Sequence, residues 1–151
     1  MKRQQKQLVS LKERIDGDVL NDKLSKIIYS TDASIYQQEP WGVILPRHQK
    51  DLIQLVGYAQ TQKIPLIPRG AGTSLAGQCV GEGIIVDTSK YMNRILEANI
   101  EQGWVWVEPG VIRDTIAQMF AQEKLLFGPE TSTSNRATIG GMIGNNSCGS
   151  H

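Results

Sequence analysis

The sequence has little cysteine and no long hydrophobic run. Cys79 and Cys148 are the only cysteines in 151 residues, and they form no CxxC or Cys/His pattern. This argues against a disulfide framework and against a zinc or iron–sulfur site made by this chain, and it favours a reducing compartment. The longest stretch without Asp, Glu, Lys or Arg covers residues 137–151 and is rich in Gly, Asn and Ser. We therefore predict no transmembrane segment.

An apolar signal-peptide core and an excess of one charge are also missing. The N-terminus begins with basic residues but soon carries Glu13 and Asp16, which argues against a transit peptide. With 16 Lys and Arg against 15 Asp and Glu, the formal net charge is +1. A dedicated nucleic-acid binder normally has a basic face, so we expect no nucleic-acid partner. These absences predict a cytoplasmic chain, with peripheral association with a membrane left open.

The chain does have enough apolar content for a buried core, since 40% of its 151 residues are hydrophobic. Residues 1–30 show helix-like periodicity and are interpreted as an N-terminal helical segment, broken near Asp16–Asp18. Residues 31–151 are interpreted as one domain in which strands alternate with helices, which indicates an α/β or α+β fold. The expected strands are 42–45, 65–68, 84–87, 94–100 and 104–108, and the expected helices are 48–62 and 111–124.

The helix expected over residues 48–62 has a clear apolar stripe, which we predict to face the core. The stripe consists of Leu52, Ile53, Val56 and Ala59. Asp51 lies in the first turn, where the helix dipole favours an acidic side chain. His48 is interpreted as a helix-start residue rather than a ligand, because a single His without partners makes no metal site.

Glycine is concentrated in two windows, since ten of the fifteen glycines lie within residues 70–83 and 128–149. The first window, PRGAGTSLAGQ, follows an expected strand, so that successive backbone N–H groups can point into one concavity that suits anionic oxygens. Arg69 adds a positive charge nearby. Neither familiar phosphate motif fits, because Gly77 comes two positions late for GxGxxG and Gln78 replaces the Walker lysine. The window therefore predicts binding of phosphate or diphosphate.

The second window reads GPETSTSNRATIGGMIGNNSCGSH and is expected to bind the same anion. Thr138 is suited to cap a short helix whose first N–H groups include those of Gly140 and Gly141. Asn145 and Asn146 suit a polar ring or a ribityl chain. Two amide-rich windows without a metal-ligand set favour binding of a dinucleotide over its hydrolysis. This interpretation requires the two windows to fold toward each other.

Together the two windows resemble the FAD-binding domain of the vanillyl-alcohol oxidase-type flavoproteins, also called the PCMH type. The chain is most similar to their FAD-linked D-2-hydroxy-acid dehydrogenases, the group of glycolate oxidase, D-lactate and D-2-hydroxyglutarate dehydrogenases. The likeness covers residues 29–151 and includes YSTDAS at 29–34 and DTSKYMNR at 87–94. It implies an α+β domain of two small sheets with flanking helices and FAD between the sheets. Because the sequence stops inside the second window, we expect the domain to be incomplete.

The resemblance also implies which residues bind FAD. Those of the first window are Arg69, Gly70, Ala71, Gly72, Thr73, Ser74, Leu75, Gly77 and Gln78. Those of the second window are Pro129, Glu130, Thr133, Thr138, Gly140, Gly141, Asn145, Gly149, Ser150 and His151, the last two approaching the flavin ring. Relatives with covalently attached flavin often have His at the position of Thr73, so covalent attachment here is not expected.

The function implied is that of a flavin-dependent oxidoreductase acting on CH–OH groups. A hydride would move from the α-carbon of a small D-2-hydroxy acid to FAD, leaving a 2-oxo acid, and the electron acceptor is unknown. The family's catalytic residues lie beyond His151, so we name no catalytic residue and no metal ligand. We expect this chain alone to be inactive and to self-associate through its open cleft. Two alternatives remain: an FAD-binding reductase of the UDP-N-acetylmuramate-dehydrogenase type, and a non-catalytic nucleotide-binding module.

Overall fold

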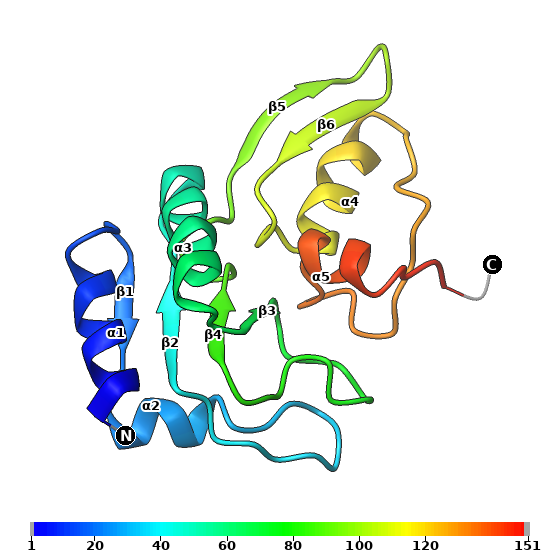
Figure 1. The fold of residues 1–151 in the computed structure, drawn as a ribbon. Coiled ribbons are helices and arrows are strands. Elements are labelled where there is room, and N and C mark those ends of the chain that lie inside the picture. The colour runs from blue at the N-terminus through cyan, green and yellow to red at the C-terminus, as the bar shows by residue number, and fades with distance from the viewer. Residues whose placement is uncertain (1, 150–151) are drawn as a thin grey trace.

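The computed structural model describes residues 2–149, which form two sheets with helices packed beside them (Figure 1). The larger sheet has the strand order β1-β2-β4-β3. Its strands are β1 (Asp18–Leu20), β2 (Gly42–Leu45), β3 (Leu66–Arg69) and β4 (Ile84–Asp87). The last three are parallel, and β1 pairs with β2 in the antiparallel direction. The smaller sheet is an antiparallel hairpin of β5 (Ile95–Asn99) and β6 (Trp104–Val107). The predicted α+β class with two small sheets and flanking helices is confirmed.

The helices are α1 (Lys2–Lys12), α2 (Lys23–Ile28), α3 (Gln49–Gln62), α4 (Arg113–Gln122) and α5 (Ile139–Gly144). The helical segment predicted for residues 1–30 contains two helices, α1 and α2, but the strand β1 between them was not predicted. Three residues are too few to show a strand alternation, and β1 forms because Val19 pairs with Ile44 of β2. Within the described residues, no helix is long and apolar enough to cross a membrane.

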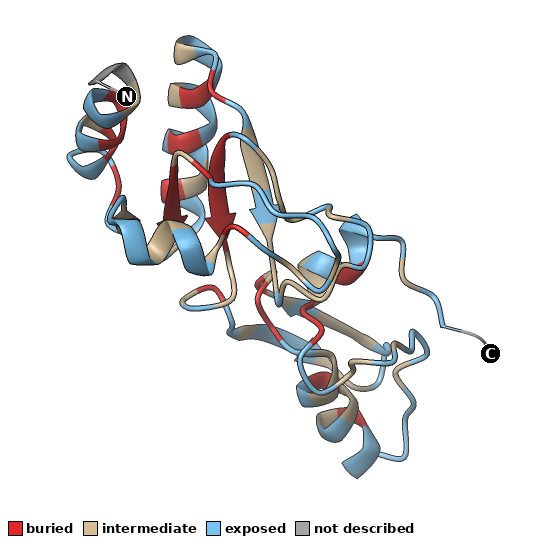
Figure 2. Cartoon of the chain, turned by 90° about the horizontal axis from the view of Figure 1, so that it is seen from below, coloured by how far each residue is buried: buried red, intermediate tan, exposed pale blue. Residues whose placement is uncertain are grey.

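The core lies on both faces of the larger sheet. All four residues of β2 and of β4 are buried, as Figure 2 shows for the central strands. One face packs against α1 and α3, with Leu11, Ile44 and Leu55 in a single cluster. The opposite face contains Val43 and Ile85 in a second cluster. Parallel strands that are covered on both faces need a continuous apolar run, and this is why the sequence located β2 and β4 correctly.

The predicted buried stripe of α3 is wrong in two of its positions. The side chains of Ile53 and Val56 are 63% and 56% exposed. The residues that are buried are Asp51, Leu55 and Ala59, spaced four apart along the helix. The helix is therefore rotated so that its first buried residue is a carboxylate, which a pattern of apolar residues cannot predict.

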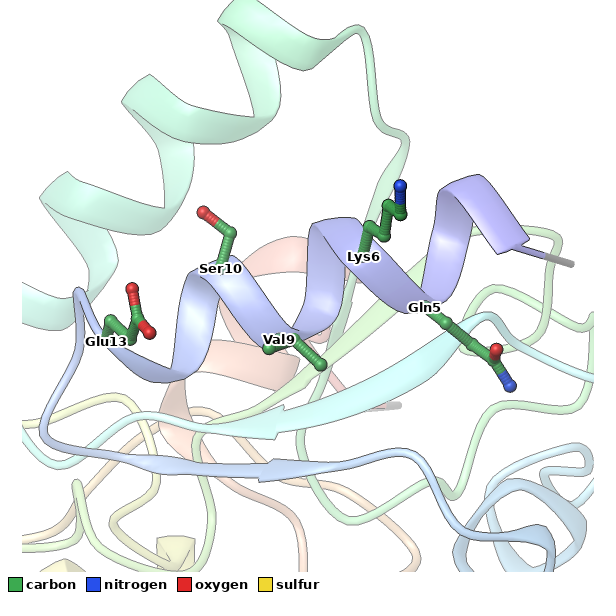
Figure 3. A pocket seen from close by; sticks show the side chains of 5 residues that line it. All are labelled: Gln5, Lys6, Val9, Ser10 and Glu13. Atoms are coloured by element: carbon green, nitrogen blue, oxygen red, sulfur yellow. The ribbon is translucent and has the colours of Figure 1, made fainter.

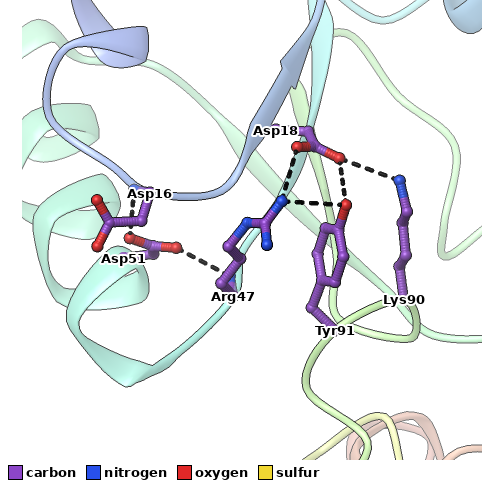
Figure 4. A network of polar contacts seen from close by, with 6 residues as sticks. All are labelled: Asp16, Asp18, Arg47, Asp51, Lys90 and Tyr91. Carbon is purple, nitrogen blue, oxygen red and sulfur yellow. Dashed lines mark hydrogen bonds and ion pairs between the residues drawn. The ribbon is translucent and has the colours of Figure 1, made fainter.

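The rotation of α3 is explained by the hydrogen bonds of Asp51. Its carboxylate is 2% exposed and accepts the backbone N–H groups of Asp16 at 2.9 Å and Arg47 at 2.8 Å (Figure 4). Two such donors offset the cost of burying a carboxylate. His48 is the N-cap of α3, as predicted, and its Nδ1 accepts the N–H of Asp51 at 3.4 Å. Asp51 thus fastens the turn before β1 to the start of α3.

Candidate functional site

The first glycine window forms a loop, residues 70–78, directly after β3. It lies at the carboxyl ends of the parallel strands, which is where open sheets of this kind bind ligands. Gly72 and Gly77 have φ angles of +67° and +75°. Residues with a Cβ rarely adopt these angles, so the two glycines are required by the path of the backbone. We refer to residues 70–78 as the first loop.

The tip of the first loop has four consecutive N–H groups that are free to bind an anion. Within the described part of the chain, no hydrogen bond uses the N–H of Gly72, Thr73, Ser74 or Leu75. The next part of the loop is fixed by Ser74, whose Oγ accepts the N–H groups of Ala76 and Gln78. Successive N–H groups without a partner are the donors that the prediction for the first glycine window requires.

The second loop, residues 128–149, contains the short helix α5. Thr138 is its N-cap, as predicted, and its Oγ1 accepts the N–H of Gly141 at 3.3 Å. The N–H of Gly140 donates to the carbonyl of Pro109 at 2.8 Å. Both N–H groups that we expected to face an anion therefore have partners inside the chain. Whether Gly140 and Gly141 contact a ligand remains a prediction, but in this structure their N–H groups are not free donors.

The two loops meet, as the interpretation of the sequence requires. The side-chain amide of Gln78 donates to Oδ1 of Asn145 at 3.0 Å across a separation of 67 residues. Oγ of Ser74 donates to Oε1 of Gln78 and so orients that amide. At the other end of the first loop, Gly70 lies so close to Thr138 that a Cβ would overlap its Oγ1. Direct contact between the loops is the condition for one ligand to touch both.

Arg69 lies beneath the first loop instead of projecting from it. Its Nη1 donates to the carbonyl of Thr31 at 2.8 Å, and its guanidinium lies 5.2 Å from the ring centre of Tyr29. A Cβ on Gly72 would stand 2.6 Å from its Nη2, so the loop curves over the guanidinium. The positive charge of Arg69 therefore lies below the free N–H groups, and this geometry favours an anion above them.

Tyr29 and Asp87 complete this support. The hydroxyl of Tyr29 donates to Oδ2 of Asp87 at 2.7 Å, and Asp87 is buried at the end of β4. Burial raises the pKa of Tyr29, and the hydrogen bond and negative charge of Asp87 raise it further. The tyrosine therefore stays protonated and acts as a donor. This fixes the base of the first loop to the neighbouring strand.

The sequence analysis missed Arg113, which organises the start of the second loop. Its Nε donates to the carbonyl of Pro129 at 3.1 Å, and its Nη2 donates to the carbonyl of Phe127 at 3.2 Å. Its Nη1 pairs with Asp114 at 3.2 Å. The helix dipole disfavours a cation in the first turn of a helix. This is the one signal in the sequence that Arg113 has a partner outside α4.

The predicted cofactor-binding residues differ in exposure, which limits how each could meet a ligand. Thr138 is buried, and the half-buried ones are Arg69, Gly70, Gly72, Thr73, Ser74, Gly77, Thr133 and Gly140. The exposed ones are Ala71, Leu75, Gln78, Pro129, Glu130, Gly141, Asn145 and Gly149. Ser150 and His151 lie outside the described residues. The half-buried group contains five of the nine residues of the first loop.

Two other features lie away from these loops. A hollow on the outer side of α1 is lined by Gln5, Lys6, Val9, Ser10 and Glu13, all from that one helix (Figure 3). The ligating atoms of Asp16, His48 and Asp51 lie within 4.8 Å of one another. Since both Asp51 oxygens already accept backbone N–H groups, we assign this cluster to the capping of α3. Neither feature offers an arrangement for catalysis.

Comparison with known proteins agrees with this geometry. Residues 40–151 match the family model described as FAD binding domain. The chain is 44% identical over 136 residues to D-2-hydroxyglutarate dehydrogenase of Escherichia coli (strain K12), which covers 88% of this chain and 13% of that protein. It is 36% identical over 126 residues to glycolate oxidase subunit GlcD of Bacillus subtilis (strain 168), which covers 82% of this chain and 27% of that protein.

Among solved structures, p-cresol methylhydroxylase with substrate bound superposes with a TM-score of 0.76 at 20% identity. The match covers 94% of this chain and 28% of that one. At this identity the likeness concerns the fold, and it confirms the p-cresol methylhydroxylase-type architecture expected from the two windows. The chain spans only a small part of the length of each of these proteins.

Proposed function

Because the chain belongs to the FAD binding domain family, we propose that it holds FAD for the oxidation of a D-2-hydroxy acid to a 2-oxo acid. The observation that carries this proposal is the contact between the two loops at Gly70–Thr138 and Gln78–Asn145. The first loop therefore runs from the N-cap of α5, Thr138, to its C-cap, Asn145, and its four N–H groups without partners lie between these two contacts in the sequence. A diphosphate bound there would touch both loops.

The residues at this site fit a flavin dinucleotide. The N–H groups of residues 72–75 suit the diphosphate oxygens, and Arg69 adds positive charge below them. Gly70 leaves room for the side chain of Thr138, because a Cβ at position 70 would overlap Oγ1 of Thr138. Asn145 and Asn146 are exposed amides that suit polar groups of the flavin or its ribityl chain. We propose that the cofactor-binding residues expected from the sequence act in this way. Gly140 and Gly141 would let the cofactor come close to the backbone, and would not offer free N–H donors.

The chemistry is divided between the cofactor and the chain. FAD, when bound, supplies the acceptor for the hydride that leaves the α-carbon of the substrate. The chain holds the diphosphate through fixed backbone dipoles, which need no rearrangement when the ligand arrives. Arg113 holds the loop that carries Pro129 and Glu130, and Arg69 and Tyr29 hold the first loop. The described residues thus orient the cofactor, and we assign none of them to proton transfer.

The proposed substrate class comes from the relatives. One is named a D-2-hydroxyglutarate dehydrogenase and the other a glycolate oxidase subunit, and both names specify a 2-hydroxy acid. We propose the same class for the protein that contains this chain, with an electron acceptor that is still to be identified. We also propose a cytoplasmic location, which the two free cysteines favour.

Self-association of the isolated chain is a further part of this proposal. Several large apolar side chains around the two loops are exposed, including Ile35 at 94%, Leu75 at 80% and Ile143 at 76%. Exposed apolar groups of this size tend to be covered by another surface. Sedimentation velocity at increasing protein concentration would detect the association, and an unchanged monomer peak would contradict it.

Binding at the two loops can be tested by titrating ¹⁵N-labelled chain with ADP, which supplies a diphosphate, and with AMP, which does not. We expect ADP to shift the amide signals of residues 72–75 and 138–145 and AMP to shift them much less. Equal effects of both nucleotides, or shifts confined to other residues, would contradict the proposal. The titration detects weak binding, so it remains informative if the isolated chain has low affinity.

The reaction can be tested in a chimera in which this chain replaces the aligned segment of the Escherichia coli relative. We expect the purified chimera to be yellow and to lose its flavin absorbance when mixed anaerobically with a D-2-hydroxy acid. The L enantiomer should leave the absorbance unchanged. A chimera that binds FAD but is reduced by neither enantiomer would contradict the proposed substrate class.

A further inference from the structure

A loop that precedes the family match contacts the first loop at two of its glycines, Gly72 and Gly77. This supporting loop, residues 30–38, closes on itself through a bridge between Thr31 and Gln37. The N–H of Gln38 also donates to the carbonyl of Ser30 at 2.9 Å, and Ser30 is buried. The family match begins only at residue 40. The supporting loop is therefore an ordered element for which the match provides no role.

Three contacts connect the supporting loop to the first loop and its base. The carbonyl of Thr31 accepts from Arg69 at 2.8 Å, before the first loop begins. The N–H of Ala33 donates to the carbonyl of Gly72 at 3.2 Å, in the middle of the first loop. The ring of Tyr36 lies against Gly77, where a Cβ would come within 2.7 Å of it. These contacts hold the first loop at its start, middle and end.

The contact in the middle determines which way a free N–H group points. In a trans peptide, the C=O of one residue and the N–H of the next point in opposite directions. Ala33 fixes the carbonyl of Gly72 toward the supporting loop. The N–H of Thr73 must then point away from the supporting loop. The supporting loop thus selects the orientation that an anion requires.

Asp32 stabilises the turn that presents Ala33. Its Oδ1 accepts the N–H of Ser34 at 2.8 Å. Burial raises the pKa of the Asp32 carboxyl, but the hydrogen bonds from Ser34 and the charge of Arg69 outweigh burial and lower it. The hydrogen bond to Ser34 therefore holds the turn in which Ala33 faces Gly72. The second oxygen of Asp32, Oδ2, is buried and has no hydrogen-bond partner among the described residues.

We propose that Asp32 and the supporting loop position the free N–H groups of the first loop for a ligand diphosphate. This inference rests on the proposed function, because it assumes that the first loop binds a diphosphate. Asp32 acts as a positioning residue through the turn that presents the N–H of Ala33 to Gly72. The positioning role of Asp32 can be tested separately from the effect of its charge, because the negative charge of a carboxylate beside an anion site repels the anion.

The test uses Asp32→Ala and Asp32→Asn, with ADP as the probe ligand. Removing a negative charge would by itself tighten ADP binding, whereas loss of positioning would weaken it. We expect Asp32→Ala to raise the Kd for ADP roughly five- to tenfold, as expected for one or two lost hydrogen bonds. Asp32→Asn keeps an acceptor for Ser34 and should have a smaller effect in the same direction. Tighter binding in both variants would overturn the inference.

The matched control is Asp22→Ala. Asp22 also accepts a backbone N–H three residues on, from Ser25 at 2.9 Å, but it caps α2 and no contact connects it to the first loop. We expect its Kd for ADP to equal that of the unmodified chain. A change as large as that of Asp32→Ala would overturn the inference, because it would show a general loss of structure.

A second measurement does not depend on ligand binding. The ¹⁵N heteronuclear NOE of residues 72–75 reports how rigid the first loop is without ligand. We expect it to fall in Asp32→Ala while the values for β4 stay unchanged. If the unmodified chain fails to bind ADP, the proposed function fails, but this measurement still tests the positioning role. If binding occurs and the NOE is equal in both proteins, only the positioning role fails.

Discussion

The side-chain amide of Gln78 donates to Oδ1 of Asn145 at 3.0 Å and so joins the two glycine-rich loops of the chain. Both side chains are exposed, and Ser74 orients Gln78 from within its own loop. An exposed hydrogen bond contributes little to the free energy of folding. Its importance lies in its position, because it joins the first loop directly to the second.

Replacement of Gln78 by Ala should therefore affect binding more than stability. We expect a change below about 0.5 kcal/mol in the free energy of unfolding, as for most surface substitutions. The Kd for ADP should rise, since the loops lose their direct connection. Thermal unfolding and the ADP titration measure the two effects. Gln60→Ala, at an exposed position of α3, is the control and should change neither quantity.

Replacement of Gly70 by Ala should destabilise the chain, because the new Cβ would overlap Oγ1 of the buried Thr138. Relieving that overlap would displace the cap of α5, and overpacking of this kind costs roughly 1–3 kcal/mol. Urea unfolding measures the cost.

Gly57→Ala is the matched glycine control for this experiment. Gly57 lies inside α3, and a Cβ there would meet nothing within 4 Å. Alanine should stabilise the helix by roughly 0.5–1 kcal/mol. If both alanine variants were equally stable, close packing at Gly70 could not be the reason for glycine there.

Glu108 should make stability depend on pH in the acid range. Its side chain is buried and pairs with Arg94, whose Nη2 lies 2.8 Å from Oε1 and whose Nε lies 3.2 Å from Oε2. The hydrogen bonds from Arg94 lower the pKa of Glu108, although burial opposes them. A carboxyl whose pKa is lower in the folded state stabilises that state above its unfolded pKa, and this contribution is lost as the pH falls through the folded pKa.

Glu108→Gln should accordingly be less stable than the unmodified chain at pH 7. The difference should shrink as the pH falls from the ordinary pKa of glutamate through the lowered pKa of the folded state, because the unmodified side chain is protonated first in the unfolded chain and then in the folded one. Urea unfolding at pH 7 and pH 3 checks this. A difference that stays constant between these pH values would show that packing, not the ion pair, is responsible.

The two cysteines should differ in reactivity. Cys148 is exposed, whereas burial raises the pKa of the half-buried Cys79. The thiolate is the reactive form, so iodoacetamide at pH 8 should modify Cys148 first. Mass spectrometry of the digested chain measures the two rates. Faster modification of Cys79 would mean that the first loop opens more readily than its contacts indicate.

Local patterns were enough to predict most of the fold. The apolar runs of β2 and β4 and the hairpin of β5 and β6 are visible in short windows, and the structure confirms them. The errors arise where a distant polar partner decides the outcome. The rotation of α3 depends on donors to Asp51 from Asp16 and Arg47, of which Asp16 lies 35 residues away.

At the candidate site, too, residues with local signals were predicted and residues with distant partners were not. The sequence identified the first loop and the cap Thr138, because glycine content and cap residues are local signals. It did not identify Arg113, whose partners lie 14 and 16 residues further on. It also could not show that the N–H of Gly140 is used by Pro109, a contact that exists only after α5 has packed.

By itself, the sequence determined that this chain has two glycine-rich loops, one after a short strand and one around a short helix, and that they have the character of a dinucleotide site. Only the tertiary structure decided that the loops touch, which of their N–H groups remain free, and that residues 30–38 support the first loop. The physical reason is that backbone conformation follows from neighbouring residues. The direction and availability of a hydrogen-bond donor depend on groups that folding brings from elsewhere in the chain.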